Sequence, residues 1–181
     1  MPATLTLSIG AQAPAFSLPG VDGKTYSLQT FAGKTTLVVI FSCNHCPTAQ
    51  ALEGRIIALA KEFESEGTAF VIINSNEDVH YPEDSFENMK IRAKEKGYPF
   101  PYVRDESQDV ARAYGAVCTP HVFVFDAERK LRYSGRVDDN WKDEKAVKSR
   151  DLRAALDALA KNQEVPNSET LPLGCSVKWR Y

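Results

Sequence analysis

The chain has 181 residues, a formal charge of −2 at neutral pH, and charged side chains that make up 25% of the sequence. The near balance of positive and negative side chains argues against binding to nucleic acid or to an anionic membrane. No apolar run approaches the roughly 20 residues that cross a bilayer, and the first residues lack the pattern of a signal peptide. We therefore expect a cytoplasmic protein.

We expect a single domain over residues 1–181, with an N-terminal extension at 1–36 and a C-terminal tail at 165–181 that packs on it. In the extension, residues 15–18 and 24–28 flank a Pro- and Gly-containing turn and predict a hairpin. Residues 37–41 are β-branched, aliphatic or aromatic, which is typical of a buried strand.

A helix is predicted to follow Pro47, because proline suits the first helical turn. Its apolar residues recur at helical spacing, namely Leu52, Ile56, Leu59, Ala60 and Phe63. Gly67 is expected to end this helix, and residues 69–74 form the next apolar strand. A strand, a helix and a strand joined by short connections predict a parallel pair with a right-handed crossover.

The second half of the chain is predicted to begin with a polar loop at 75–83. Asp84 and Glu87 match a capping pair for a helix that ends at Gly97. A short extended segment that ends at Arg104-Asp105 and a small helix from Ser107 to Gly115 should follow. An antiparallel hairpin over 121–137 comes next, and a last helix with Leu152, Ala155, Leu156 and Leu159 on its apolar face. Ser149 is the predicted cap of the last helix.

Two cysteines, Cys43 and Cys46, stand three positions apart where the predicted strand meets the predicted helix. On one helical turn they would share a face, close enough to form a disulfide or to bind a metal. The positive end of a helix favours the thiolate, which is the reactive form of cysteine. In a chain without an export signal, this CxxC pattern indicates redox chemistry or metal binding rather than a structural disulfide.

Metal binding requires further ligands, and Cys118, His121 and Cys175 are the candidates. No second CxxC accompanies these candidates, so the sequence favours a redox dithiol over a metal site. Inert thiols are the third interpretation of Cys43 and Cys46. Cys118 is interpreted first as a buried apolar residue and second as a redox thiol. Cys175 is either structural or a third redox cysteine, if the tail folds back onto the sheet with Trp179 as an anchor.

His45 and Glu77 could each have a role in catalysis or be ordinary solvated loop residues. His45 lies between the cysteines, where an imidazolium would stabilise a thiolate, or it is a solvated loop residue. Glu77 follows the strand at 69–74, near the carboxyl end where ligand sites of α/β sheets gather. It could accept a proton from Cys46, or be a solvated loop carboxylate.

These motifs together resemble the thioredoxin fold: a strand ending in CxxC at a helix start, a βαβ unit, and Thr119-Pro120 before an antiparallel hairpin. The segment at 9–18 and the insert near 75–105 resemble the branch shared by peroxiredoxins and TlpA-like thiol oxidoreductases. The Cys43-Asn44-His45-Cys46-Pro47 signature and the tail at 174–179 are similar to peroxiredoxin-like thioredoxin-family proteins. The resemblance implies an α/β fold with a central mixed sheet flanked by helices.

The resemblance also implies a cis peptide bond at Thr119-Pro120, facing the dithiol. In the expected cycle Cys43, the more exposed thiol, attacks a substrate disulfide and Cys46 resolves the mixed disulfide. The supporting residues would be Asn44, His45, Pro47, Thr119 and Glu77. We expect a protein or small-molecule disulfide as substrate, an external thiol as reductant, and no cofactor.

A peroxidase is the first alternative, because the resemblance extends to peroxiredoxins. Their Pro-x-x-x-Thr-x-x-Cys motif, aligned on Cys46, requires proline at 39 and threonine at 43, where this chain has Val39 and Cys43. Pro120 stands where that family keeps an arginine. These differences disfavour peroxide chemistry and favour disulfide exchange. A non-catalytic module that clasps a metal is the second alternative.

Overall fold

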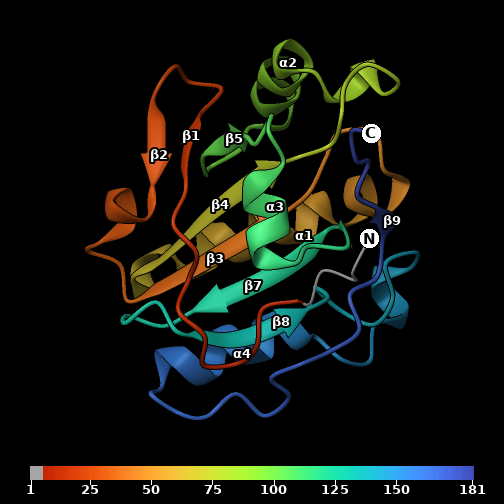
Figure 1. The fold of residues 1–181 in the computed structure, drawn as a ribbon. Helices are drawn as coiled ribbons and strands as arrows, with labels where there is room; N and C mark the ends of the chain where they lie inside the picture. The colour runs from red at the N-terminus through yellow and green to blue at the C-terminus, as the bar shows by residue number, and fades with distance from the viewer. Residues whose placement is uncertain (1–5) are drawn as a thin grey trace.

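A five-stranded mixed sheet forms the centre of the computed structural model, which describes residues 6–181 (Figure 1). The strand order is β5-β4-β3-β7-β8. Its members are β5 (Tyr102–Arg104), β4 (Thr68–Asn74), β3 (Thr36–Phe41), β7 (His121–Phe125) and β8 (Leu131–Gly135). β3, β4 and β5 are parallel, whereas β7 pairs antiparallel with both β3 and β8. The predicted mixed sheet is confirmed.

The parallel half is built as the sequence predicts. Helix α1 (Pro47–Phe63) connects β3 to β4, and a 3₁₀ turn, η2 (Glu64–Glu66), extends it to Gly67. Gly67 has a φ of 76°, a left-handed conformation that glycine adopts without a steric penalty. Gly67 therefore ends the helical segment as predicted, although α1 itself ends at Phe63 and the last turn is 3₁₀.

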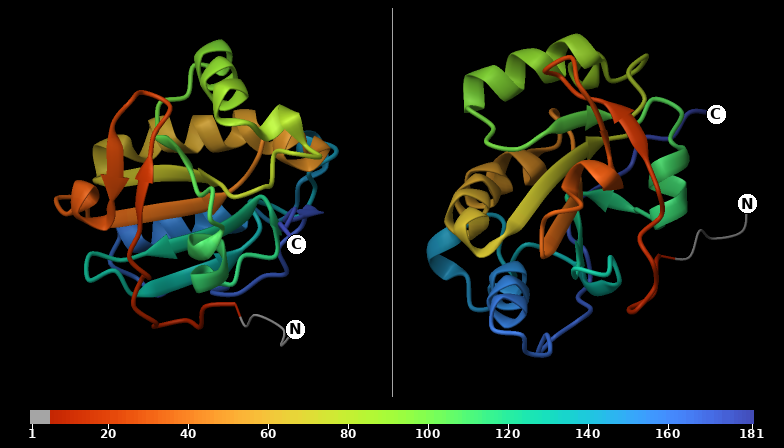
Figure 2. Two further views of the ribbon diagram at one scale, coloured as in Figure 1. Left: turned by 45° about the horizontal axis from the view of Figure 1, so that its top comes forward. Right: turned by 90° about the vertical axis from the view of Figure 1, so that its left-hand side faces the viewer.

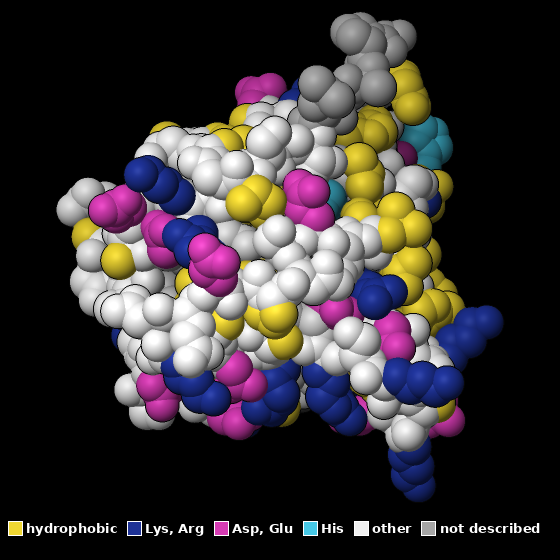
Figure 3. All heavy atoms as spheres, turned by 90° about the horizontal axis from the view of Figure 1, so that it is seen from below, with side chains coloured by type: hydrophobic (Ala, Val, Ile, Leu, Met, Phe, Trp, Pro, Cys, Tyr) yellow, Lys and Arg dark blue, Asp and Glu magenta, His cyan; other side chains and the backbone are white. Residues whose placement is uncertain are grey.

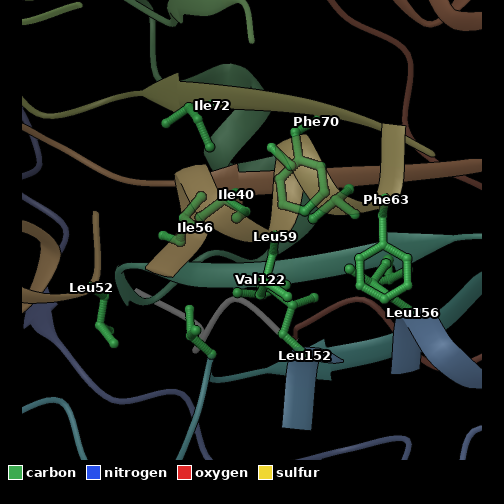
Figure 4. Packing of buried hydrophobic residues seen from close by; sticks show 14 of the residues in the cluster. Ile40, Leu52, Ile56, Leu59, Phe63, Phe70, Ile72, Val122, Leu152 and Leu156 are labelled. Atoms are coloured by element: carbon green, nitrogen blue, oxygen red, sulfur yellow. The ribbon is translucent and has the colours of Figure 1, made fainter. Parts of the chain in front are cut away.

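Two apolar layers cover the two faces of the sheet, because successive strand residues point to opposite sides. On one face α1 and α4 (Asp151–Ala160) bury leucines, isoleucines and phenylalanines against β3, β4 and β7 (Figure 4). On the other face lie α3 (Asp109–Tyr114) and the N-terminal segment, as the turned views show (Figure 2). Both faces are buried, which explains the continuous apolar runs in β3 and β7.

The N-terminal hairpin is confirmed as β1 (Ser17–Pro19) paired with β2 (Thr25–Ser27), followed by η1 (Leu28–Phe31). The first five residues of the expected extension lie outside the described residues. The remaining short elements are η3 (Pro82–Asp84), α2 (Phe86–Lys96) and η4 (Glu144–Ala146).

Both predicted helix caps in the second half are wrong. Ser85, not Asp84, caps α2, and its hydroxyl accepts a hydrogen bond from the Asn88 amide. Ser149 donates to the carboxylate of Asp151 and does not cap α4, because Arg150 occupies the capping position. In each case the residue at the capping position is the one directly after the predicted cap.

The C-terminal tail folds back beside the sheet. After α4 it runs along the edge of the molecule to β9 (Cys175–Ser176), which pairs antiparallel with β6 (Cys118–Thr119) (Figure 1). Trp179 packs on the second apolar layer, and the Arg112 guanidinium lies 5.0 Å from its ring centre. Trp179 thus holds this part of the tail against that layer.

The surface carries interspersed charges of both signs on the face that Figure 3 shows. Within residues 6–181, no helix has the length and apolar character needed to cross a membrane.

Candidate active site

Cys43 and Cys46 lie in the loop between β3 and α1, and not on the first helical turn as predicted. The helix begins at Pro47, so Cys46 is its N-cap residue and Cys43 precedes it by three positions. Proline at the first helical position explains this start. Both cysteines are buried, with exposed fractions of 4% for Cys43 and 0% for Cys46. Cys43 is the more exposed of the two, but only slightly.

Thr119-Pro120 forms the wall opposite the dithiol, and its peptide bond is cis as expected. The Cys43 sulfur lies 3.3 Å from the Thr119 hydroxyl oxygen. The Cys46 sulfur lies 3.3 Å from the Thr119 carbonyl oxygen. The structure thus brings together four of the predicted site residues, which come from two distant parts of the sequence.

The tail adds a third sulfur to this site. The Sγ atom of Cys175 lies 2.6 Å from that of Cys46, although the two residues are 129 positions apart. All four cysteines of the chain are unbridged thiols in this structure. Cys118 does not join the group: its sulfur is buried and lies 3.7 Å from the Pro120 carbonyl. Burial raises the pKa of the Cys118 thiol to about 12, which suits the interpretation as an inert apolar residue.

The electrostatics favour a thiolate at Cys46 rather than at Cys43. The hydrogen bond between the two thiols is the largest cause; it lowers the pKa of Cys46 to about 4 and raises that of Cys43. The main-chain amides of Ala49 and Cys175 also favour the Cys46 thiolate, while burial and the charge of Asp84 oppose ionisation of Cys43. Burial raises the pKa of Cys175. Within the pair, Cys46 is thus the thiol that ionises more readily.

A buried carboxylate, Asp84, lies beneath the dithiol loop, and no sequence motif points to this role. It pairs with the His45 imidazole and accepts a 2.6 Å hydrogen bond from the Asn44 amide. The side chains of Asn74 and Asn76 donate to the same carboxylate. Asp84 was expected to cap a helix; instead its four partners fix the conformation of the loop that carries both cysteines.

His45 is therefore held in place and is not a freely solvated residue. Its ring stacks on Tyr81 with centroids 4.8 Å apart. Asn44 is held by Tyr102, whose hydroxyl donates to its side-chain oxygen at 2.7 Å. These contacts set the direction in which the loop presents Cys43.

Glu77 forms hydrogen bonds within its own loop and to the tail. Its carboxylate accepts hydrogen bonds from the Val79 and His80 amides and from the His80 ring. Its own amide donates to the Lys178 carbonyl at 2.9 Å. Glu77 thus holds a loop and the tail, and this geometry does not support the prediction that it accepts a proton from Cys46.

The metal ligands suggested by the sequence do not assemble. His121 accepts a hydrogen bond from the Val117 amide at Nδ1, and its Nε2 lies 3.4 Å from the Ser134 hydroxyl, so both ring nitrogens are engaged. Within the described part of the chain, one different trio has its ligand atoms within 4.8 Å of one another: Cys43, His45 and Asp84. That trio is already joined by the His45–Asp84 pair.

Comparison with known proteins gives the family. The pattern of the Redoxin family matches residues 8–155, which is most of the chain. The chain belongs to the Redoxin family. This places it among thioredoxin-like redox proteins, a group with both peroxiredoxin-like and thiol-disulfide oxidoreductase relatives.

Named relatives come from both of those groups. A Mycobacterium tuberculosis protein, named as a candidate peroxiredoxin, is 27% identical over 144 residues, covering 78% of this chain and 85% of its own. The thiol-disulfide oxidoreductase ResA of Geobacillus thermodenitrificans is 23% identical over 128 residues, covering 70% and 68%. This Redoxin-family chain is thus similar to proteins of both groups.

Two solved structures are much more similar. An uncharacterized conserved protein from Geobacillus kaustophilus is 43% identical with a TM-score of 0.91, and the alignment covers 96% of this chain and 93% of that one. A hypothetical protein from Sinorhizobium meliloti 1021 is 38% identical with a TM-score of 0.92, covering 97% of each chain. Nearly the whole fold of this Redoxin-family chain therefore has solved counterparts.

Proposed function

We propose that this Redoxin-family chain is a thiol–disulfide oxidoreductase that uses Cys43 and Cys46 as its redox dithiol. The observation that carries the proposal is geometric: the two cysteines stand at the start of α1, and each sulfur lies 3.3 Å from Thr119 of the cis Thr119-Pro120 wall. A thiolate is the form of cysteine that attacks disulfides.

In the proposed cycle Cys43 passes its proton to the Cys46 thiolate and attacks one sulfur of the substrate disulfide. The substrate S–S bond breaks, and one substrate thiolate leaves and takes up a proton. Cys46 then loses its proton and attacks the Cys43 sulfur of the mixed disulfide, which releases the second substrate thiol. The enzyme ends as a Cys43–Cys46 disulfide, and an external thiol reductant restores the dithiol.

Cys43 is assigned the first attack because of access. The Cys46 sulfur is fully buried and has the Cys175 sulfur against it, whereas Cys43 retains some exposure. A polar hollow bordered by Asn44, His45 and Gln50 opens beside the loop that carries Cys43. The substrate class is a protein or small-molecule disulfide.

The test is reduction of insulin disulfides coupled to dithiothreitol. Cys43→Ser should abolish the activity while far-UV circular dichroism stays unchanged, because the sulfur that starts the exchange is gone. Cys46→Ser should accumulate a mixed disulfide on Cys43, and Cys118→Ser should retain full activity as the matched control. Full activity of Cys43→Ser would overturn the proposal, and a mixed disulfide trapped on Cys46 in Cys43→Ser would reverse the two roles.

A thiol-dependent peroxidase is the second candidate. The lowered pKa of Cys46 favours it, since Cys46 aligns with the peroxide-attacking cysteine of peroxiredoxins, and so does the name of the mycobacterial relative. Val39 and Cys43 in place of proline and threonine disfavour it. Consumption of hydrogen peroxide with dithiothreitol as donor, lost in Cys46→Ser, would support it.

A non-catalytic metal module is the remaining candidate, and the trio of Cys43, His45 and Asp84 is its supporting observation. Elemental analysis of the purified protein separates it from the redox candidates. A stoichiometric metal lost in His45→Ala, together with an inactive dithiol, would favour the module.

A further inference from the structure

The C-terminal tail is held over the dithiol by contacts that are specific to it. Strand β9 pairs with β6 so that Cys175 lies opposite Thr119, the residue that contacts both active-site sulfurs. Gly174 approaches the wall so closely that a Cβ atom there would overlap the Thr119 carbonyl oxygen. The tail backbone therefore fits against this wall only with glycine at position 174.

Residues beyond β9 fix the tail further. The Lys178 carbonyl accepts hydrogen bonds from the Glu77 amide and from the Gln108 side chain, at 2.9 and 2.8 Å. The Lys178 amide donates to the Asn76 side chain, and the Arg180 amide donates to that of Gln108. Since Asn76 also binds Asp84, the tail and the dithiol loop are anchored to one polar cluster.

This anchoring places the Cys175 sulfur 2.6 Å from that of Cys46. A disulfide bond is about 2.05 Å long, so a shift of about half an ångström would bring the two sulfurs to bonding distance. Cys46 is thus the central sulfur of three, in contact with Cys43 on one side and with Cys175 on the other. Cys175 is the most exposed of the three.

We propose that Cys175 is a third redox cysteine, which takes over the disulfide from the Cys43–Cys46 pair and presents it to the external reductant. The proposal rests on the proposed function, which supplies the oxidised pair. The Cys175 thiol loses its proton and its sulfur attacks the Cys46 sulfur. The Cys43–Cys46 bond breaks, Cys43 leaves as a thiolate and takes up the proton, and a Cys46–Cys175 bond forms.

No oxidant or reductant is consumed in this step, because one disulfide replaces another. Its product differs from the first disulfide in position: one of its sulfurs now belongs to the tail, where a reductant thiol has better access. Cys43 is free again on the other side of the site. The tail thereby separates the place where the substrate is reduced from the place where the enzyme is reduced.

The test is disulfide mapping at redox equilibrium. The protein is equilibrated with oxidised and reduced dithiothreitol, quenched with acid, alkylated and digested, and the peptides are identified by mass. We expect the oxidised wild type to contain a Cys46–Cys175 bridge with Cys43 alkylated. Cys175→Ser should contain the Cys43–Cys46 bridge instead.

A swapped variant, Cys175→Ser with Ser176→Cys, is the matched control. It keeps four thiols but moves the tail thiol to the opposite face of the strand, so no bridge from the tail to Cys46 should form. The Cys43→Ser variant should still form the Cys46–Cys175 bridge, because that pair does not need Cys43 for its geometry.

The outcomes distinguish the two proposals. If oxidised wild type contains only the Cys43–Cys46 bridge, with Cys175 alkylated throughout, the relay is wrong while the oxidoreductase proposal stands. If neither wild type nor Cys175→Ser forms a bridge that includes Cys43, the proposed function itself fails. A tail bridge of equal yield in the swapped variant would contradict the geometric argument.

Discussion

At the scale of single residues, the site is defined by which of its thiols ionises more readily. Cys46 caps α1 and its pKa falls to about 4, chiefly through its hydrogen bond with Cys43. The same hydrogen bond raises the pKa of Cys43, and burial and the Asp84 carboxylate add to this shift. The Asp84 carboxylate is in turn paired with the imidazole of His45. The reactivity of Cys43 should therefore depend on a carboxylate buried beneath the loop.

Removing that charge should make Cys43 easier to ionise. We expect Asp84→Asn to increase the rate at which Cys43 is alkylated at a fixed pH by several-fold, because a carboxylate no longer opposes the thiolate; mass mapping of the peptides follows the rate at this one cysteine. His45→Ala should lower the same rate, because it removes a hydrogen-bond partner of the carboxylate.

Asparagine keeps the shape of Asp84 and part of its hydrogen bonding, and circular dichroism controls for the fold. Equal alkylation rates of Cys43 in the wild type and both variants would show that this cluster only fixes the loop.

The sequence indicates the dithiol but not the groups that tune it. Cys43, Cys46 and Thr119-Pro120 carry recognisable motifs, so these site residues could be predicted. Asp84 could not, because an acidic residue before a helix is a common capping pattern. Its partners Asn44 and His45 lie 40 and 39 positions away in the sequence. The sequence also does not fix which cysteine is the N-cap residue of α1, because Cys43 and Cys46 are separated by less than one helical turn.

At the scale of elements, the two-residue strand β9 decides how much of the site is covered. It pairs with the wall strand β6, and Gly174 permits the close approach. Overpacking of a close contact typically costs about 1–3 kcal/mol. Adding one methyl group at position 174 therefore tests whether this contact holds the tail in place.

We expect Gly174→Ala to release the tail, since its Cβ would overlap the Thr119 carbonyl. Alkylation of Cys175 in the native reduced protein should speed up, and limited proteolysis should cut the tail first. Gly54→Ala is the control: Gly54 lies in α1 with no atom near a built Cβ, and the change should stabilise the protein by about 0.5–1 kcal/mol. Unchanged alkylation of Cys175 in Gly174→Ala would mean that the tail is not held by this contact.

The elements that the sequence predicts well are those with a regular apolar pattern, such as β3, α1, β4 and β7. Periodicity of 2 or 3.6 residues, or a continuous apolar run, identifies them. β9 has no such pattern, because two residues are too few to show one and its pairing partner β6 is distant in the sequence. The packing of the tail could be expected from Trp179, but not the 2.6 Å approach of Cys175 to Cys46.

At the scale of the whole molecule, the lowered pKa of Cys46 couples the site to stability. The folded pKa, about 4, lies below the ordinary value of 9.0. Between these values the unfolded chain binds more protons than the folded one, so the stabilisation decreases as pH falls. It is complete near pH 9 and lost below about pH 4.

We therefore expect reduced wild type to gain stability over Cys46→Ser as pH rises from about 4 to about 8. Urea unfolding of both proteins at each pH measures the difference and cancels the titration of the carboxylates they share. A difference that stays constant over this range would contradict a Cys46 thiolate in the folded protein.

Redox titration shows most directly whether Cys43 and Cys46 form a reversible redox dithiol. The protein is equilibrated in dithiothreitol buffers of graded potential, and its free thiols are counted by mass after alkylation. In Cys175→Ser, where the tail cannot take over the disulfide, a reversible Cys43–Cys46 dithiol should give one two-electron transition, and adding Cys43→Ser should abolish it. Cysteines that stay fully alkylated at every potential would contradict the proposed redox role of this pair.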